Sequence, residues 1–128
     1  MISIEGVIQL HEKLINKFGG AAGIRDMEAL KSSLLRPYQT FNGSELYPTT
    51  LHKASALVES ILINHPFIDG NKRLGYFLMR LILLQNKLDI KASEDDKYFF
   101  ILGIAKGDIK FEEIYHWLEV QVTKVNSA

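Results

Sequence analysis

HPFIDGNKRLG (residues 65–75) joins two of the most apolar segments of the chain. Pro66 disfavours helical geometry at the residue before it, so we expect the preceding helix to end near His65. A second helix is predicted to begin at about Asn71, and its stretch Leu74–Leu84 is apolar on nearly every side. A helix without a polar face is typical of the centre of a protein. We therefore predict that this helix is the central and most buried element.

Helical periodicity dominates the rest of the chain, and short breaks divide it into segments. Apolar residues recur every three or four positions in each segment, which places them on one face of a helix. Asp26, Thr49 or Thr50, and Ser93 precede three of these segments and are suited to cap helices. The sequence thus predicts an all-α fold, a compact bundle of about six helices. Their expected ranges are about 4–18, 26–34, 50–65, 71–84, 93–105 and 111–122.

The segment PYQTFNGSELYP (residues 37–48) has no helical period. Its Asn42-Gly43 pair lies between Thr40-Phe41 and Leu46-Tyr47, and such a pair is typical of a two-residue hairpin turn. A two-stranded hairpin alone is only marginally stable. We predict a short hairpin, or flap, on the surface before the central pair of helices.

The overall composition restricts the class of protein. The 128 residues suit one domain, with 47% apolar and 23% charged residues. A formal net charge of +0 argues against direct nucleic-acid binding and against an anionic membrane surface. The absence of cysteine excludes disulfides, thiolate metal sites and a cysteine nucleophile. No apolar run reaches the roughly 20 residues of a membrane span, and no signal peptide is recognisable, so we expect a cytoplasmic protein.

Residues 70–73 have the chemistry of a phosphate-binding turn. The first turn of a helix carries unpaired N–H groups and a positive dipole end, and Gly70 permits close approach of a ligand. Lys72 and Arg73 add positive charge there, although cations are disfavoured at a helix N-terminus unless an anion binds. The alternative interpretation is a plain Asp-Gly turn followed by a solvated helix start.

Two further residues of the same stretch supply the remaining parts of a phosphoryl-transfer site. Asp69 precedes the turn, and a single carboxylate beside bound phosphates is a usual ligand of Mg²⁺. His65 lies across the loop and is the natural proton acceptor near neutral pH. The combination indicates transfer from a nucleotide to a hydroxyl group.

Two polar residues outside the loop are expected to be structural. Arg80 lies seven residues after Arg73 on the same helix face, and we expect it to form a buried salt bridge with Glu59; a substrate role is the alternative. His11 lies on an apolar stripe and is predicted to be a packing histidine with its hydrogen bonds satisfied.

The segment from His65 to Arg73 resembles the signature of the Fic/Doc family, and specifically of its Doc (death-on-curing) branch. The common Fic signature is H-x-F-x-D/E-G-N-G-R-x-x-R. Here Lys72 replaces the second glycine and Tyr76 stands in place of the final arginine, and both departures are similar to Doc. The segment GIRDMEALKSSLLRP from Gly23 and the flap also resemble Doc-type toxins.

The resemblance implies a Fic-type fold and a set of residue roles. His65 would be the base, Asp69 would hold Mg²⁺, and Gly70, Asn71, Lys72 and Arg73 would bind the phosphates of ATP, with Asn71 also holding the loop. The flap would dock an extended segment of the target protein. Its residues are Phe41, Asn42, Gly43, Leu46 and Tyr47.

The resemblance further implies a toxin that transfers the γ-phosphoryl group of ATP to a Ser/Thr hydroxyl of elongation factor Tu, and that is inhibited by a Phd-like antitoxin. The segment Ser55–Glu59 fits part of the inhibitory S/T-x-x-x-E-G/N pattern of other Fic proteins, but Ser60 follows it, which favours inhibition in trans. Two alternatives stay open. One is a Fic-type AMP transferase that acts on protein hydroxyls, and the other is a non-catalytic helical binding module.

Overall fold

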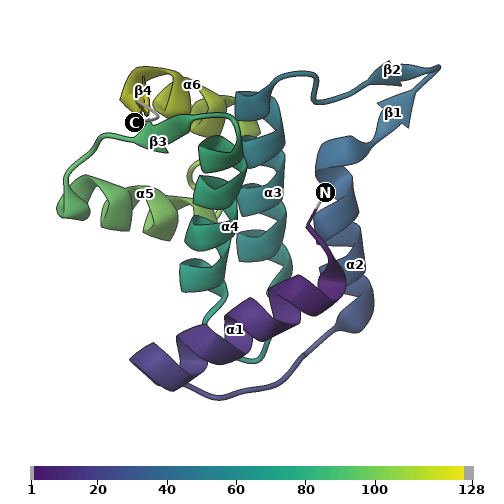
Figure 1. Cartoon of the computed structure of the whole chain (residues 1–128), viewed down its shortest axis with the longest axis vertical. Helices are drawn as coiled ribbons and strands as arrows, with labels where there is room; N and C mark the ends of the chain where they lie inside the picture. Colours follow the sequence, from purple (N-terminus) through teal and green to yellow (C-terminus); the bar gives the residue numbers. More distant parts are fainter. Residues whose placement is uncertain (1, 126–128) are drawn as a thin grey trace.

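The computed structural model describes residues 2–125, and these form six α-helices with a few short strands (Figure 1). The predicted all-α class is confirmed, and the helices begin and end within a few residues of the expected positions. The elements in chain order are α1 (Ile4–Phe18), α2 (Met27–Leu35), the 3-10 turn η1 (Arg36–Tyr38), β1 (Thr40–Phe41), β2 (Ser44–Glu45), α3 (Thr50–Asn64), α4 (Asn71–Gln85), β3 (Leu88–Ile90), α5 (Glu94–Ala105), α6 (Phe111–Gln121) and β4 (Val122–Lys124).

Helices α3 and α4 lie side by side at the centre of the molecule (Figure 1). Thr49 caps the first of them by accepting a hydrogen bond from the His52 N–H, and His65 ends it in the left-handed conformation. Gly75 lets the pair approach closely, because a Cβ atom added there would lie 3.1 Å from Leu62 Cδ2. The two helices therefore form the scaffold on which the loop between them is mounted.

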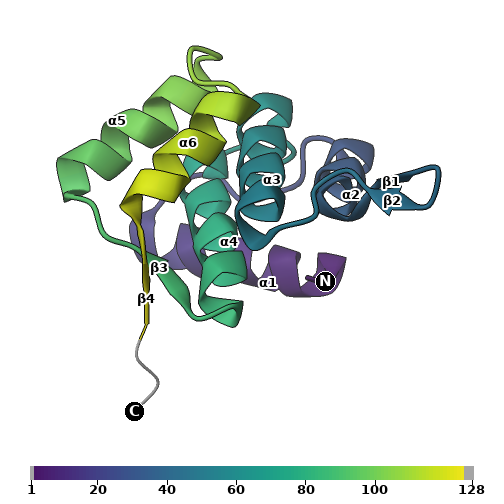
Figure 2. The ribbon, with the colours of Figure 1, turned by 90° about the horizontal axis from the view of Figure 1, so that it is seen from above.

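The other four helices pack around this central pair. Helix α1 crosses the pair near the loop, α2 lies on one side, and α5 and α6 lie on the other (Figures 1 and 2). The side chains of Asp26 and Ser93 cap α2 and α5 by accepting hydrogen bonds from N–H groups three residues later, as predicted. Phe67 in the loop is 1% exposed and belongs to the same core as the helices.

The prediction that α4 is the most buried element is wrong. Only Ile63 of α3 is exposed, whereas α4 exposes Lys72 and Arg73 in its first turn and leaves Leu81 and Leu84 37% and 39% exposed. Helix α3 is enclosed by α2, α4 and α6, whereas one face of α4 borders solvent between α1 and α5. An apolar sequence therefore did not imply complete burial of this helix.

The predicted hairpin is present and projects from the bundle (Figure 2). Thr40 pairs with Glu45 and Phe41 with Ser44, in antiparallel register. Asn42 and Gly43 both have positive φ, 50° and 79°, which is the backbone of a type I′ turn.

The expected salt bridge between Arg80 and Glu59 is absent, because each residue has another partner. Arg80 donates two hydrogen bonds of 2.9 Å to the two oxygens of Asp89. Arg36 lies 2.9 Å from the Glu59 carboxylate. Asp89 belongs to β3, which pairs with β4 in a two-stranded ribbon that the helical periodicity did not predict.

No helix in residues 2–125 has the length and apolar character needed to cross a membrane.

We expect Gly75→Val to destabilise the protein by about 1–3 kcal/mol, because the added methyl groups must displace Leu62 and push α3 and α4 apart. Denaturant unfolding followed by circular dichroism measures the change. Leu84→Val on the half-exposed face of α4 is the matched control and should change stability by no more than about 0.5 kcal/mol. Equal unfolding midpoints for the Gly75 variant and the wild type would contradict the tight helix packing.

Candidate active site

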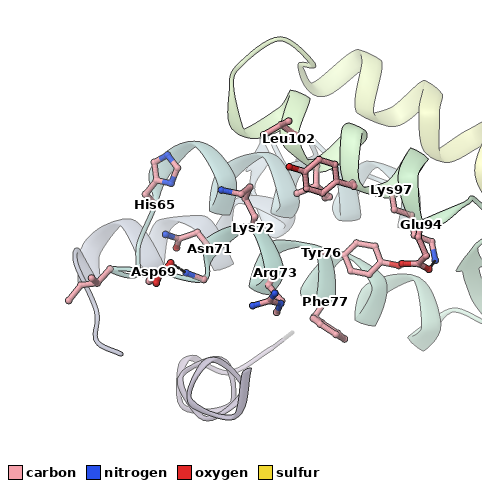
Figure 3. A pocket seen from close by; sticks show the side chains of 14 residues that line it. His65, Asp69, Asn71, Lys72, Arg73, Tyr76, Phe77, Glu94, Lys97 and Leu102 are labelled. Carbon is pink, nitrogen blue, oxygen red and sulfur yellow. Dashed lines mark hydrogen bonds and ion pairs between the residues drawn. The ribbon is translucent and has the colours of Figure 1, made fainter. Parts of the chain in front are cut away.

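The loop between α3 and α4 forms one end of a groove of about 660 Å³ (Figure 3). All six residues that the sequence predicted for catalysis, metal binding and phosphate binding line this groove. They are His65, Asp69, Gly70, Asn71, Lys72 and Arg73. The five predicted flap residues do not line it.

His65 directly follows α3 and caps its C-terminal end, with φ 46° and ψ 60°. A non-glycine residue in the left-handed region costs conformational energy, so its surroundings must hold it there. Its carbonyl accepts a hydrogen bond of 2.6 Å from Arg25 Nε, while another nitrogen of the same guanidinium contacts the Asn64 carbonyl. The imidazole itself is exposed and lies at the loop end of the groove (Figure 3).

The segment before α2 pairs with the loop as a short antiparallel bridge. Ile24 is the bridge partner of Phe67, and the Ile68 N–H donates to the Gly23 carbonyl at 3.0 Å. The N–H groups of Arg25 and Asp26 both donate to the Pro66 carbonyl. The sequence had identified this segment only as part of a family resemblance, and the structure shows that it fixes the loop.

Asn71 holds the loop from the other side. Its Oδ1 accepts from the Phe67 N–H at 3.0 Å and its Nδ2 donates to the Phe67 carbonyl at 2.9 Å. The residue is 8% exposed. The predicted contact with the loop is therefore present, and one Nδ2 hydrogen is left for a further acceptor.

His11 of α1 supports the loop from beneath. Its ring stacks on Phe67 with 3.8 Å between the ring centroids, and its Nε2 lies 2.8 Å from the Asp69 carbonyl oxygen. The residue is 2% exposed. The prediction of a satisfied packing histidine is confirmed.

The Asp69 carboxylate is exposed and held by backbone groups. It accepts hydrogen bonds from the N–H groups of Ala21 and Gly70, at 3.1 and 2.8 Å. These two N–H groups, with the nearby charge of Lys72, hold the pKa of Asp69 below its usual value. Residues 2–125 contain no cluster of three metal-ligating side chains. A single ionised carboxylate fits Mg²⁺ that arrives with phosphates and keeps most of its waters.

The start of α4 is open to an anion. Gly70 has φ 75°, and no side chain caps the helix. The first N–H groups of a helix have no partner within it, so those after Gly70 are available to phosphate oxygens. A Cβ atom at Gly70 would lie 3.2 Å from Ile15 and would add backbone strain.

The two cations of this turn are directed to different places. Lys72 lies on the side of His65, whereas the Arg73 guanidinium lies 4.2 Å from the ring centroid of Phe18 on α1 (Figure 3). Arg73 is thus held by a cation–π contact at the edge of the groove.

The opposite wall of the groove was not predicted. Helix α5 contributes Glu94, Lys97 and Tyr98 to this wall, and Glu94 and Lys97 lie beside Tyr76 of α4 (Figure 3). The spacing of Glu94 and Lys97 predicts only a local ion pair on one helix. No local pattern in the sequence predicts that they lie near a loop some 25 residues earlier.

Comparison with known proteins shows which family and which protein this chain is similar to. A sequence model of the Fic/DOC family matches residues 1–83. A protein described as Toxin Doc, from Mycolicibacterium smegmatis (strain ATCC 700084 / mc(2)155), is 36% identical over 78 residues. That alignment covers 61% of this chain and 60% of the relative, less than two thirds of its length. The family match includes the loop and the start of α4, and it ends before α5.

We expect Arg25→Ala to loosen the loop, because it removes the donors to the carbonyls of Asn64 and His65. Hydrogen exchange over residues 64–70 should accelerate, and stability should fall by about 1–2 kcal/mol. Arg25→Lys should restore only part of the protection, since an ammonium lacks the planar fork. Lys31→Ala, which removes a 3.6 Å surface ion pair with Glu28, is the control and should leave this exchange unchanged. Unaltered exchange in Arg25→Ala would show that the bridge, Asn71 and His11 hold the loop without this side chain.

Proposed function

The chain belongs to the Fic/DOC family, and on that premise we propose that it is a toxin that transfers the γ-phosphoryl group of ATP to a Ser/Thr hydroxyl of a protein. The observation that carries the proposal is the arrangement at the loop end of the groove. An exposed imidazole, an ionised carboxylate and an uncapped helix N-terminus lie together there, on a backbone fixed by contacts from α1, α4 and the segment before α2.

The proposed reaction assigns one task to each group. His65 accepts the proton of the target hydroxyl while the hydroxyl oxygen forms a bond to the γ-phosphorus. The bond from that phosphorus to the bridging oxygen breaks, and ADP leaves. The N–H groups after Gly70, with Lys72 and Arg73, stabilise the charge on the phosphate oxygens. Asp69 would hold Mg²⁺, which would neutralise part of the phosphate charge.

The phosphoryl transfer is proposed over AMP transfer because of two residues. The common Fic signature has glycine and arginine where this chain has Lys72 and Tyr76. Both departures are similar to the Doc branch, and the curated relative carries the name Toxin Doc. A non-catalytic binding module is the remaining alternative, and the presence of both His65 and Asp69 argues against it.

The partners are proposed from the same resemblance. We take elongation factor Tu as the target and a Phd-like antitoxin, acting in trans, as the inhibitor, with residues 1–128 acting as one Fic/Doc domain. This pairing would place the protein in the cytoplasm, without direct contact to nucleic acid or membrane.

We propose that the hairpin guides the target. Phe41 and Leu46 are 67% and 50% exposed, and a two-stranded hairpin offers a free edge to an extended peptide. None of the predicted flap residues lines the groove, so the proposed contact is with the target and not with the nucleotide.

Deleting Ser44 and replacing Asn42-Gly43 with a rigid turn should impair phosphorylation of elongation factor Tu and leave ATP binding nearly unchanged. Filter-bound label from γ-labelled ATP measures phosphorylation of the target, and calorimetry measures ATP binding. Target modification at the wild-type rate would remove the hairpin from the mechanism.

His65→Ala should reduce transfer by roughly 10²–10⁴-fold and keep affinity for ATP and Mg²⁺, because the imidazole acts on the hydroxyl. His116→Ala is the matched control, since His116 is exposed on α6 and forms a surface ion pair with Glu119. ATP labelled at the α or the γ phosphate is incubated with each variant and with elongation factor Tu or cell extract. Label from the γ position supports the proposed function, and label from the α position supports AMP transfer. No label from either position would favour the binding module.

A further inference from the structure

We propose that Arg36 is a positioning residue for target recognition, because it fixes the direction in which the hairpin of β1 and β2 leaves the bundle. The inference rests on the proposed function, in which this hairpin guides the protein target. Arg36 does not line the groove, so its role is separate from nucleotide binding.

The hairpin has too few contacts to set its own direction. It consists of two residue pairs and the turn at Asn42 and Gly43, and residues 40–46 are all exposed. A two-stranded hairpin of this kind is only marginally stable in water. Its direction must therefore be set at its base, where the chain enters β1 and leaves β2.

Arg36 joins the two ends of the hairpin. It lies in η1, which precedes β1, and its Nε donates a hydrogen bond of 3.1 Å to the hydroxyl of Tyr47, which follows β2. The guanidinium carbon also lies 5.4 Å from the ring centroid of Tyr47. This contact closes the hairpin at its base.

The same guanidinium attaches the base of the hairpin to α3. Its Nη1 lies 2.9 Å from Glu59 Oε1, 3.0 Å from Ser60 Oγ and 3.3 Å from the Ala56 carbonyl oxygen. The side chains of Arg36 and Glu59 are 24% and 18% exposed, so solvent screens their ion pair only in part. Burial opposes the charge of Arg36, but hydrogen bonds with Tyr47 and Glu59 outweigh this effect and raise the pKa of the guanidinium.

Phe111, the first residue of α6, packs against this base. Its ring meets the ring of Tyr47 at 61°, with 5.3 Å between the centroids, and the guanidinium carbon of Arg36 lies 5.7 Å from the Phe111 ring centroid. Both contacts are favourable geometries for aromatic rings. Helix α6 lies beyond the 1–83 range of the family match, so the support of the hairpin includes a part of the chain that the match does not cover.

Lys53 of α3 provides a second anchor. Its ammonium lies 3.0 Å from Glu45 Oε1 of β2 and also contacts the Tyr47 carbonyl oxygen. This anchor should keep the hairpin attached when Arg36 is changed. Loss of the Arg36 contacts should therefore alter the direction and mobility of the hairpin and leave the fold of the bundle intact.

A fixed hairpin presents its free edge to an extended peptide without first being ordered. Ordering a mobile segment on binding costs conformational entropy and lowers affinity. The proposed role of Arg36 thus predicts weaker binding of the target when its contact with Tyr47 is removed, with unchanged chemistry at the loop of residues 65–70.

Kinetics with elongation factor Tu and γ-labelled ATP separate target binding from chemistry. Arg36→Lys keeps a cation for Glu59, but one ammonium cannot occupy the positions of both Nε and Nη1. We expect it to raise the KM for the target by roughly tenfold, the scale of one hydrogen bond to a charged group, and to leave kcat and ATP affinity within about twofold. Phe111→Leu should raise the KM by a smaller factor. Lys106→Gln, which removes a surface ion pair with Asp108, is the control and should change none of these quantities.

Hydrogen exchange gives a readout that does not depend on activity. In Arg36→Lys, exchange should accelerate at the Leu46 N–H, which donates to the Gln39 carbonyl at 3.0 Å, and stay unchanged over residues 64–70. Circular dichroism verifies that each variant is folded. If Arg36→Lys does not fold, Phe111→Leu carries the same two measurements.

Each other outcome overturns the inference. A wild-type KM, or wild-type exchange in the hairpin, would show that Arg36 does not position it. A lower kcat at unchanged KM would show that Arg36 acts on the chemistry. These outcomes leave the proposed function in place, whereas a wild type that transfers no label to protein would overturn the proposed function and the role of Arg36 together.

Discussion

The loop of residues 65–70 must satisfy its backbone hydrogen bonds without belonging to a helix or a sheet, because it is anchored in the core by Phe67. Donors and acceptors from three directions meet this requirement. Arg25 and its neighbours bind the carbonyls of residues 64–66, Asn71 binds both backbone groups of Phe67, and His11 binds the carbonyl of Asp69. The positions of α1 and of the segment before α2 follow from this constraint.

Because buried residues satisfy the backbone hydrogen bonds of the loop, its exposed side chains are free for a ligand. Asn71 and His11 are buried and occupied with backbone groups, whereas His65 and Lys72 are exposed and Asp69 is bound only by N–H groups. A fixed backbone also keeps His65 in a conformation that it would not adopt alone. The polar residues between two apolar helices thus fall into a buried set that supports the loop and an exposed set that is accessible to a ligand.

Local signals predicted the parts of the fold that local interactions determine. Capping by Thr49 and Ser93, the Asn42-Gly43 turn and the break at Pro66 depend on neighbours within four residues, and all were found. His65 and residues 69–73 likewise line one groove because they are close in sequence. Periodicity does not encode tertiary packing, and three features that depend on it were not predicted. These are the pairing of Arg80 with Asp89, the contacts of Arg25 and the wall that α5 contributes to the groove.

The ribbon of β3 and β4 affects the order in which parts of the chain can fold during synthesis. Residues 88–90 pair with residues 122–124, so the intervening α5 and α6 are enclosed between two strands that meet only late in the chain. During synthesis, α1–α4 and the loop of residues 65–70 can form before β4 is available to pair with β3. A nascent chain would then display the imidazole and the anion-binding turn on an unfinished groove. The groove would be complete only after residues 122–124 have left the ribosome and paired with residues 88–90.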